Sequence, residues 1–233
     1  MRLRKKPWVS GALEEYSDSV LIKDLLCAKT LAAGANLDDE MKKVSDKLKG
    51  HWHEIFGRKA PLHVELGTGK GKFISEMAER YPEVNFVGIE SQQDVLYYVA
   101  EKIREKGLTN VRLLVFDVTN ILEIFAAGEV SRFYINFCDP WPKVRHAKRR
   151  LTHVNFLDKY AIALTAGGEI FFKTDNRILF DFSLEQFAER HLELDQVTFD
   201  LHGAAAPFNI MTEYETKFSS MGTKINRCEI KFP

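Results

Sequence analysis

Three glycines, Gly67, Gly69 and Gly71, directly follow the apolar run 62–66. Glycine lets the backbone turn sharply and approach a ligand closely, because it has no Cβ. We therefore predict a strand, a loop that cradles a nucleotide and the start of a helix, with an ordinary strand-to-helix turn as the alternative. Lys72 stands where the dinucleotide fingerprint G-x-G-x-x-G needs its third glycine, and the phosphate-loop pattern G-x-x-x-x-G-K-[ST] is absent. The kind of nucleotide therefore stays open from this loop alone.

The later apolar runs end in carboxylates. Glu90 closes the second run, at the spacing of about 20 residues at which an acid accepts hydrogen bonds from ribose hydroxyls, as suits S-adenosylmethionine or NAD alike. Asp117, Asp139 and Asp175 end three further runs. Asp117 could accept the adenine amine or start a helix, and Asp175 could cap the helix that follows it. Because ligands of open α/β sheets bind outside the carboxyl ends of the strands, we expect these ends to line one crevice.

Asp139 opens a stiff turn that leads into a basic run. It is followed by Pro140, Trp141 and Pro142, and proline fixes its own φ and restricts the residue before it. Such stiffness suits a reacting group that must be held beside a cofactor. Five of the eight residues 143–150 are Lys or Arg and one is His. The run predicts a strip for RNA phosphates, and a structural turn with an exposed cationic face is the alternative.

The N-terminus carries a second basic cluster. Residues 2–8 contain Arg2, Arg4, Lys5 and Lys6 followed by Trp8. They could form an arm for phosphates, with the indole stacking or anchoring it. A frayed, solvated terminus is the alternative.

Composition limits the partners and the compartment. The 233 residues include 33 basic and 33 acidic side chains, so a polyanion must be held by local clusters and not by a global positive field. Cys27, Cys138 and Cys228 show no metal-ligand spacing, which predicts no metal and a reducing compartment. No apolar run is long enough to span a membrane. We expect a cytoplasmic protein that is a monomer or a homodimer.

The elements that must position these residues alternate from residue 62 onward. Alternation of strands and helices is typical of a mostly parallel sheet with helices on both faces. The predicted strands are 62–66, 85–90, 111–117, 132–138, 168–174, 195–201 and 226–232, the last two forming an antiparallel end. The predicted helices are 38–56, 71–80, 92–106, 151–165 and 178–190, with a short helix between the last two strands.

Several longer motifs together resemble the bacterial tRNA (guanine-N7)-methyltransferases. They are Arg-Lys-Lys-Pro-Trp near the start, Glu-Leu-Gly-Thr-Gly-Lys-Gly at 65–71, Gly-Ile-Glu at 88–90, Asn-Phe-Cys-Asp-Pro-Trp-Pro-Lys at 136–143, Phe-Lys-Thr-Asp-Asn at 172–176 and Met-Thr-Glu-Tyr-Glu-Thr-Lys-Phe at 211–218. The resemblance covers most of the chain. It implies a Rossmann-like α/β fold with a mostly parallel seven-stranded sheet and an antiparallel C-terminal strand. The methyltransferase domain would span 62–233, behind a basic arm and helical extension at 1–61.

The resemblance also implies a reaction and a set of site residues. The reaction is transfer of a methyl group from S-adenosylmethionine to N7 of a guanine in tRNA, at position 46 of the variable loop. The implied cofactor-binding residues are Glu65, Gly67, Gly69, Gly71, Glu90, Asp117 and Asp139, of which Asp139 is also the catalytic residue. The implied substrate-binding residues are Lys143, Asp175, Thr212, Glu213, Tyr214 and Glu215. The implied RNA-binding residues are Arg145, His146, Ala147, Lys148, Arg149 and Arg150. Cys138 and Val144 depart from the family pattern as we expect it.

The proposed reaction places few demands on acid–base chemistry. Guanine N7 has a free lone pair and no proton, so no general base is needed, and a carboxylate can support the positive charge that moves onto the purine. Trp141 or Tyr214 could stack on an extruded base. Thr212 and Glu215 also form a capping box, which can open a helix without excluding a substrate role.

Three other functions remain open from the residues alone. They are an NAD-dependent oxidoreductase, an RNA-binding module without catalysis and an S-adenosylmethionine enzyme for another substrate, including another RNA. The first lacks an evident set of partners for hydride transfer. The second leaves the acids at the strand ends without a purpose, and a small-molecule or protein substrate leaves the basic clusters unexplained.

Overall fold

The computed structural model describes residues 6, 8–23, 36–204 and 209–233. Arg2, Arg4, Lys5 and Cys27, for which we predicted roles, lie outside these residues. The chain forms two compact units, Met1–Phe125 and Ala126–Pro233, and each is described by itself. The predicted boundary between an extension at 1–61 and a domain at 62–233 stays a prediction.

The first unit is built on four parallel strands. They lie in the order β1-β4-β3-β2, with the bounds β1 Val20–Ile22, β2 Leu62–Leu66, β3 Asn85–Glu90 and β4 Val111–Val115. β3 is buried along its whole length except at Glu90. Continuous burial of this kind is typical of a parallel strand that is covered on both faces.

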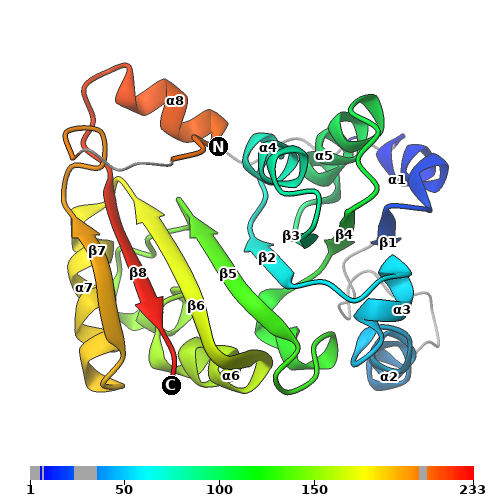
Figure 1. Cartoon of the computed structure of the whole chain (residues 1–233), viewed down its shortest axis with the longest axis horizontal. Helices are drawn as coiled ribbons and strands as arrows, with labels where there is room; N and C mark the ends of the chain where they lie inside the picture. The colour runs from blue at the N-terminus through cyan, green and yellow to red at the C-terminus, as the bar shows by residue number, and fades with distance from the viewer. Residues whose placement is uncertain (1–5, 7, 24–35, 205–208) are drawn as a thin grey trace. The chain divides into compact units, whose positions relative to one another are not determined.

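Helices lie on both sides of this sheet. Figure 1 shows α4 and α5 on one side of β2, β3 and β4, and α2 and α3 on the other. The bounds are α1 Val9–Ala12, η1 Leu13–Tyr16, α2 Leu37–Leu48, α3 Trp52–Phe56, α4 Lys72–Arg80, α5 Gln93–Glu105 and η2 Val118–Glu123. The apolar stripe of α5 is buried, as its spacing predicts.

The single helix predicted over residues 38–56 is wrong. Two helices, α2 and α3, occupy this stretch, and Gly50 between them has φ +83°. A residue in the left-handed region ends a right-handed helix, and glycine adopts it at little cost. Asn36 caps α2 by accepting a hydrogen bond from the amide of Asp38 at 3.1 Å.

The second unit has a mixed sheet in the order β5-β6-β8-β7. β5 and β6 are parallel, while β8 runs antiparallel to both β6 and β7, so the predicted antiparallel end is confirmed. The strand bounds are β5 Val130–Asn136, β6 Leu164–Thr174, β7 Glu193–Thr198 and β8 Asn226–Lys231. Together the two units hold eight described strands against the seven predicted, and β1 had no predicted counterpart.

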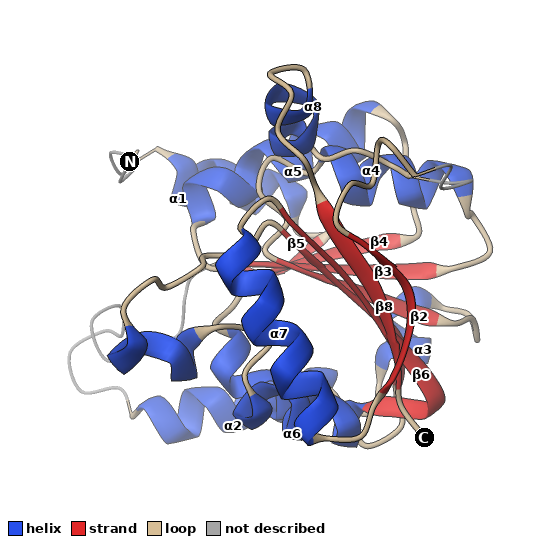
Figure 2. Ribbon diagram, turned by 90° about the vertical axis from the view of Figure 1, so that its left-hand side faces the viewer, coloured by secondary structure: helices blue, strands red, loops and turns tan. Residues whose placement is uncertain are grey.

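Three α-helices and a 3-10 turn complete the second unit. They are η3 Val144–Arg149, α6 Val154–Ala163, α7 Arg177–Glu189 and α8 Glu213–Ser219. α6 and α7 lie on the same side of β5, β6 and β8 (Figure 2). α8 lies beyond the carboxyl ends of β5 and β6 (Figure 1). This end of the sheet carries most of the residues predicted to bind the substrate.

Some strands end earlier than predicted. β4 ends at Val115 and β5 ends at Asn136. Asp117 and Asp139 therefore lie in the segments that follow the strands, where the backbone is free to leave the ladder.

Trp52 anchors α3 and gives a test of the packing in the first unit. Its side chain is 1% exposed and donates a hydrogen bond from Nε1 to the carbonyl of Ile124 at 2.8 Å. Trp52→Ala should lower the free energy of unfolding by about 3–5 kcal/mol, because it leaves a cavity. Trp52→Phe should cost much less, since it keeps most of the packing and loses the hydrogen bond, worth about 1 kcal/mol.

Denaturant unfolding of the parent protein, Trp52→Ala and Trp52→Phe measures both losses of unfolding free energy. Trp8→Ala is the matched control, because the indole of Trp8 is 53% exposed. Equal midpoints for Trp52→Ala and Trp8→Ala would contradict the assignment of Trp52 to the core.

Candidate active site

The glycine-rich loop of the first unit leaves β2 in the conformation that the sequence predicts. Gly67, Gly69 and Gly71 have φ values of +83°, +53° and +82°, a region that favours glycine. The amide of Gly67 still donates to the carbonyl of Ile89 at 2.8 Å. The loop is thus joined to β3 before it turns into α4.

The three glycines differ in what a side chain would meet. A Cβ at Gly71 would lie 2.5 Å from Cγ1 of Val99 on α5. Gly67 and Gly69 face open space, with nothing within 4 Å of the Cβ position. Gly71 therefore serves close packing of the loop on a helix, and the other two leave room for a ligand.

Glu90 links the end of β3 to this loop. Its Oε2 accepts a hydrogen bond from the amide of Gly69 at 3.3 Å, and its Oε1 accepts one from the amide of Gln92 at 3.0 Å. Burial raises the pKa of this carboxyl, and the backbone hydrogen bonds from Gln92 and Gly69 oppose the rise. The structure brings the two predicted cofactor elements together, as neighbouring parallel strands should.

Glu65 and Asp117 have different surroundings. Glu65 is buried within β2. Asp117 is exposed and caps η2, because its Oδ1 accepts from the amide of Thr119 at 2.9 Å and from its hydroxyl at 2.7 Å. The alternative that Asp117 starts a helix is therefore confirmed, and its contact with adenine stays a prediction.

The loop fits a nucleoside-containing cofactor. The hydroxyl of Thr68 is buried and has no hydrogen-bond partner within the described part of the chain. Two glycines face open space beside it, and the Glu90 carboxylate is an acceptor suited to ribose hydroxyls. An orphaned buried donor next to an open backbone is what a bound polar ligand would complete.

In the second unit Asp139 lies in a strained turn. Phe137 and Trp141, on either side of it, have φ values of +53° and +41°, which cost about 1–2 kcal/mol each for residues with a Cβ. Asp139 itself is exposed. Burial raises the pKa of the neighbouring Cys138 thiol to about 12, which favours its protonated form near neutral pH.

The basic strip is only partly available to RNA. Lys143, Arg145, Lys148 and Arg149 are exposed, whereas His146 and Ala147 are half-buried. Val144, which departs from the family pattern, is 87% exposed. The guanidinium of Arg149 lies 4.9 Å from the centre of the Trp141 ring.

Arg150 differs from the rest of the strip. Its side chain is buried, donates to the carbonyls of Pro140 and Trp141, and covers the ring of Phe182. A guanidinium that is buried and already donates to two carbonyls is less available to a phosphate than the exposed cations of the strip. RNA contact by Arg150 stays a prediction.

Asp175 and Tyr214 meet beyond the end of β6. The Tyr214 hydroxyl donates to Oδ2 of Asp175 at 2.9 Å, while Asn176, not Asp175, caps α7 by accepting from the amide of Leu179. Burial, together with the hydrogen bond to Asp175, raises the pKa of Tyr214 to about 12. The alternative that Asp175 is only a helix cap is wrong.

Tyr214 also forms an aromatic stack. Its ring lies 4.1 Å from that of Phe218 with an interplanar angle of 26°, and 5.1 Å from that of Phe137. Tyr214 remains 41% exposed. The structure thus brings it to the turn of Asp139, because Phe137 is two residues before that acid.

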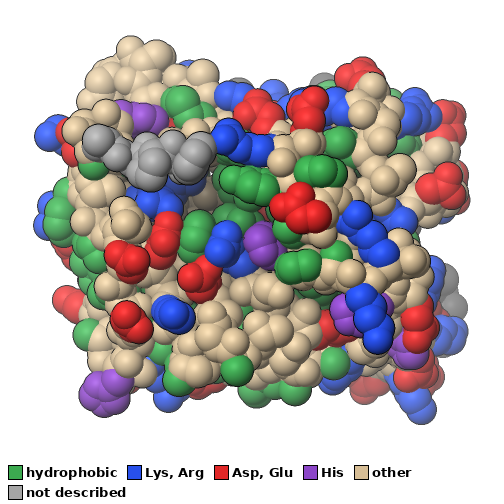
Figure 3. All heavy atoms as spheres, viewed as in Figure 1, with side chains coloured by type: hydrophobic (Ala, Val, Ile, Leu, Met, Phe, Trp, Pro, Cys, Tyr) green, Lys and Arg blue, Asp and Glu red, His purple; other side chains and the backbone are tan. Residues whose placement is uncertain are grey.

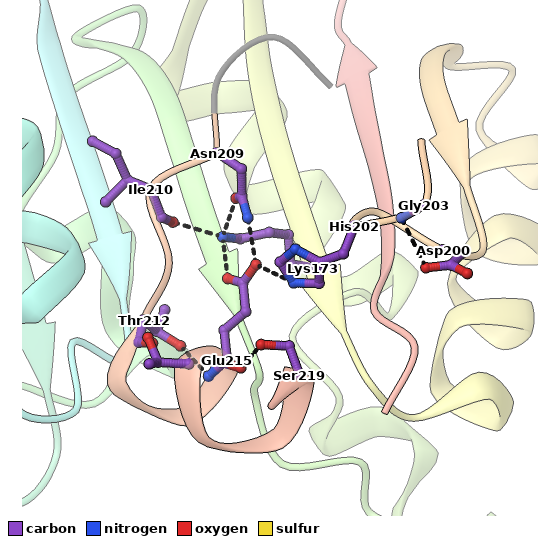
Figure 4. Close-up of polar contacts among 10 residues, drawn as sticks. Lys173, Asp200, His202, Gly203, Asn209, Ile210, Thr212, Glu215 and Ser219 are labelled. Atoms are coloured by element: carbon purple, nitrogen blue, oxygen red, sulfur yellow. Dashed lines mark hydrogen bonds and ion pairs between the residues drawn. The ribbon is translucent and has the colours of Figure 1, made fainter. Parts of the chain in front are cut away.

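The predicted capping box at the start of α8 is half formed. Oγ1 of Thr212 accepts a hydrogen bond from the amide of Glu215 at 2.9 Å. The Glu215 side chain instead accepts from Nζ of Lys173 at 2.7 Å and from the side-chain Nδ2 of Asn209 (Figure 4). His202 lies on the other side of this carboxylate, with Nε2 3.3 Å from Oε1.

This network gives Glu215 a different position from its neighbours in the motif. Glu215 is fully buried, whereas Glu213 is half-buried and Tyr214 is exposed. Lys173 also donates to the carbonyl of Ile210 at 3.0 Å, so it ties both α8 and the segment before it to the end of β6 (Figure 4). The geometry therefore makes Glu215 an internal anchor of the motif.

Sequence reasoning missed Lys173 and Asn209. The signal for Lys173 was its place in the predicted strand 168–174 directly after Ile170, Phe171 and Phe172, where an unpaired cation would be too costly to bury. Asn209 had no signal that we can identify in its own surroundings.

Charges elsewhere are mixed. Side chains of both signs are interspersed over the face drawn in Figure 3. Among the described residues no group of three or more His, Cys, Asp or Glu side chains could hold a metal ion. No helix within the described ranges is long and apolar enough to cross a membrane.

Comparisons with known proteins decide the family. A family model described as "Putative methyltransferase" matches residues 59–228. The chain is 46% identical over 232 residues to the tRNA (guanine-N(7)-)-methyltransferase of Halalkalibacterium halodurans, covering 100% of this chain and 96% of that protein. It is 43% identical over 232 residues to the enzyme of the same name from Bacillus subtilis, covering 100% and 99%. The chain belongs to the tRNA (guanine-N7)-methyltransferase family.

More distant structures agree on the fold. A 30S ribosomal A1408 methyltransferase from an uncultured bacterium superposes with a TM-score of 0.56 at 16% identity, covering 77% of this chain and 91% of that one. The Rossmann-like methyltransferase fold and the methyltransferase class of enzyme, both predicted from the sequence, are therefore confirmed. S-adenosylmethionine, the predicted cofactor, agrees with this family and with the open glycine loop.

Gly71 provides a test of the cofactor loop. Gly71→Ala should lower both the free energy of unfolding and the affinity for S-adenosylmethionine, because it combines a strained φ, costing about 1–2 kcal/mol, with the clash against Val99. Adding Val99→Ala should recover part of the loss, since it relieves the clash and leaves the strain. Denaturant unfolding and titration calorimetry measure the two quantities, with Val99→Ala alone as the baseline.

Gly57→Ala, outside the glycine loop, is the matched control for Gly71→Ala. Gly57 has φ +65° and nothing within 4 Å of its Cβ position. It should show the cost of strain without a change in cofactor affinity. No recovery in the double variant would contradict the assigned clash.

Lys173 provides a test of the buried anchor. Lys173→Met should lower the free energy of unfolding by about 3–5 kcal/mol, because it leaves the Glu215 carboxylate buried without its cation. Adding Glu215→Gln should recover much of the loss, since the unpaired charge is gone. Arg190→Met, which breaks the surface pair with Asp158, should cost no more than about 1 kcal/mol. Similar losses of unfolding free energy in Lys173→Met and Arg190→Met, measured by denaturant unfolding, would refute the role of Lys173 as a buried anchor.

Proposed function

We propose that this chain transfers the methyl group of S-adenosylmethionine to N7 of a guanine in tRNA, and that the guanine lies in the variable loop. The relatives named above carry this activity in their names and match the whole length of the chain. The observation that carries the proposal is the hydrogen bond between Tyr214 and Asp175 beside the turn of Asp139. An exposed aromatic ring next to carboxylates suits a purine that must be held flat and must bear positive charge.

The reaction needs orientation more than proton transfer. S-adenosylmethionine supplies a methyl group on a positively charged sulfur, and the lone pair of guanine N7 accepts it without losing a proton. Positive charge then develops on the purine. A carboxylate fixed in a stiff turn can orient the base and stabilise that charge, and Asp139 has this place in the chain.

The substrate motif divides between contact and support. Thr212, Glu213 and Tyr214 are proposed to face the guanine together with Asp175, and Glu213 could accept hydrogen bonds from the N1 and N2 donors of the base. Glu215 is proposed to act through the position of α8, because it is fully buried against Lys173. Glu65, Glu90 and the glycine loop are proposed to hold the cofactor.

The tRNA backbone is proposed to lie along the exposed cations. Lys143, Arg145, Lys148 and Arg149 carry the charge, and His146 and Ala147 lie between them. Each phosphate contact should lower the slope of log K against log salt by about 0.7–0.9. Cytoplasmic location follows from a tRNA substrate, and a monomer or a homodimer is compatible with the proposal.

One experiment tests the activity directly. The protein is incubated with labelled S-adenosylmethionine and unmodified tRNA, and the modified nucleoside is identified and mapped. Label in 7-methylguanosine of the variable loop is the expected result. Label on another base of the tRNA, or no label in the tRNA, would refute the proposal.

Replacing Asp139 distinguishes a role in the methyl-transfer step from a role in binding the cofactor. Asp139→Asn should reduce turnover by about 100-fold or more, by analogy with the loss of one electrostatic group from an active site, while affinity for S-adenosylmethionine changes little. Single-turnover methylation and titration calorimetry measure the two effects. Asp158→Asn, at an exposed carboxylate on α6, is the control. Equal losses of turnover and cofactor affinity would indicate a binding role for Asp139.

A further inference from the structure

The basic strip contains one arginine that is unlike its neighbours. Arg150 is 6% exposed, whereas Arg145, Lys148 and Arg149 are exposed. A charged side chain is almost never buried without partners that use its donors. The partners of Arg150 therefore show what it does.

Arg150 holds the turn that carries Asp139. Its Nε donates to the carbonyl of Pro140 at 3.0 Å, and an Nη atom donates to the carbonyl of Trp141 at 3.1 Å. The guanidinium presents its donors in a rigid planar fork, so it can bridge two successive carbonyls. A lysine ammonium group is a compact point charge and lacks this fork.

The turn lacks donors and bears strain. Pro140 and Pro142 have no amide hydrogen, and Trp141 has φ +41°. Two hydrogen bonds from a charged donor are stronger than neutral ones, so they help to offset the strain of the turn. Arg150 thus supplies what the backbone of the turn cannot supply itself.

Arg150 is in turn fixed to α7. Its guanidinium lies 4.3 Å from the centre of the Phe182 ring. Two residues later, Oγ1 of Thr152 shares a buried hydrogen bond of 2.7 Å with Oγ of Ser183, and the amide of Val154 donates to Gln186 at 3.1 Å. The turn is therefore connected through Arg150 to a helix of the scaffold and not to solvent.

We infer that Arg150 is a positioning residue, which fixes the Asp139 turn on α7 and does not contact the RNA. The expected effect of Arg150 on turnover rests on the proposed function. The geometry of the turn is independent of the substrate.

The first test compares Arg150→Ala with Arg145→Ala in amide hydrogen exchange. Exchange in the segment 137–143 should become faster in Arg150→Ala, because the carbonyls of Pro140 and Trp141 lose their donors, and should stay as in the parent protein in Arg145→Ala. Unchanged exchange in Arg150→Ala would overturn the inference. This result needs neither tRNA nor catalysis, so it stands apart from a failure of the parent protein to methylate tRNA.

The second test uses the methylation reaction and salt. Arg150→Ala should reduce turnover by about 10- to 100-fold, the range that a misplaced reacting group can cost, with the slope of log K for tRNA against log salt unchanged. Arg145→Ala should make that negative slope shallower by about 0.7–0.9, because it removes a phosphate contact. A slope that becomes shallower by the same amount in both variants, with turnover of Arg150→Ala unchanged at saturation, would overturn the inference.

Chemical rescue covers the case in which the alanine variant folds poorly. Guanidinium ion at millimolar concentration should restore part of the turnover of Arg150→Ala by filling the space left by the side chain, and it should not restore the tRNA affinity of Arg145→Ala. Arg150→Lys should show an intermediate turnover, since it keeps the charge and loses the fork. Turnover of Arg150→Lys equal to that of the parent protein would overturn the need for two donors.

Discussion

Parallel strands that are neighbours end at the same edge of the sheet, and this constraint underlies every site in the protein. In the first unit it places the loop after β2 next to the end of β3, so that the amide of Gly69 reaches the carboxylate of Glu90. In the second unit β5 and β6 are parallel neighbours with Asn136 beside Lys173. Residues from motifs that are distant in the sequence meet there because their parallel strands end at the same edge of the sheet.

Burial then separates residues of the same type into different roles. Arg145 and Arg150 are five positions apart in one basic run, yet one is exposed and the other is enclosed by a turn and a helix. Glu213 and Glu215 differ in the same way within one motif. A buried charge must have partners in place, so it fixes the surrounding backbone, whereas an exposed charge stays available to a ligand.

Two buried cationic side chains, Lys173 and Arg150, fix different parts of the second unit. The Lys173 and Glu215 pair fixes α8, which carries Tyr214. The side chain of Arg150 fixes the turn that carries Asp139. In both cases a long cationic side chain bonds to backbone carbonyls as well as to its other partners, and the residues proposed to touch the substrate are left on the outside.

Features that depend on near neighbours along the chain could be predicted from the amino-acid sequence. The glycine loop at 67–71, the alternation of strands and helices and the cap at Thr212 could be predicted, because backbone freedom, periodicity and capping act over a few residues. The family was predicted from the resemblance of several longer motifs. The break at Gly50 was within reach of the same reasoning. By contrast, the three-dimensional fold was needed to show that Arg150 is buried, that Glu215 pairs with Lys173 and that Tyr214 bonds to Asp175. These outcomes depend on desolvation by segments far away in the chain, and no local pattern records which segments those will be.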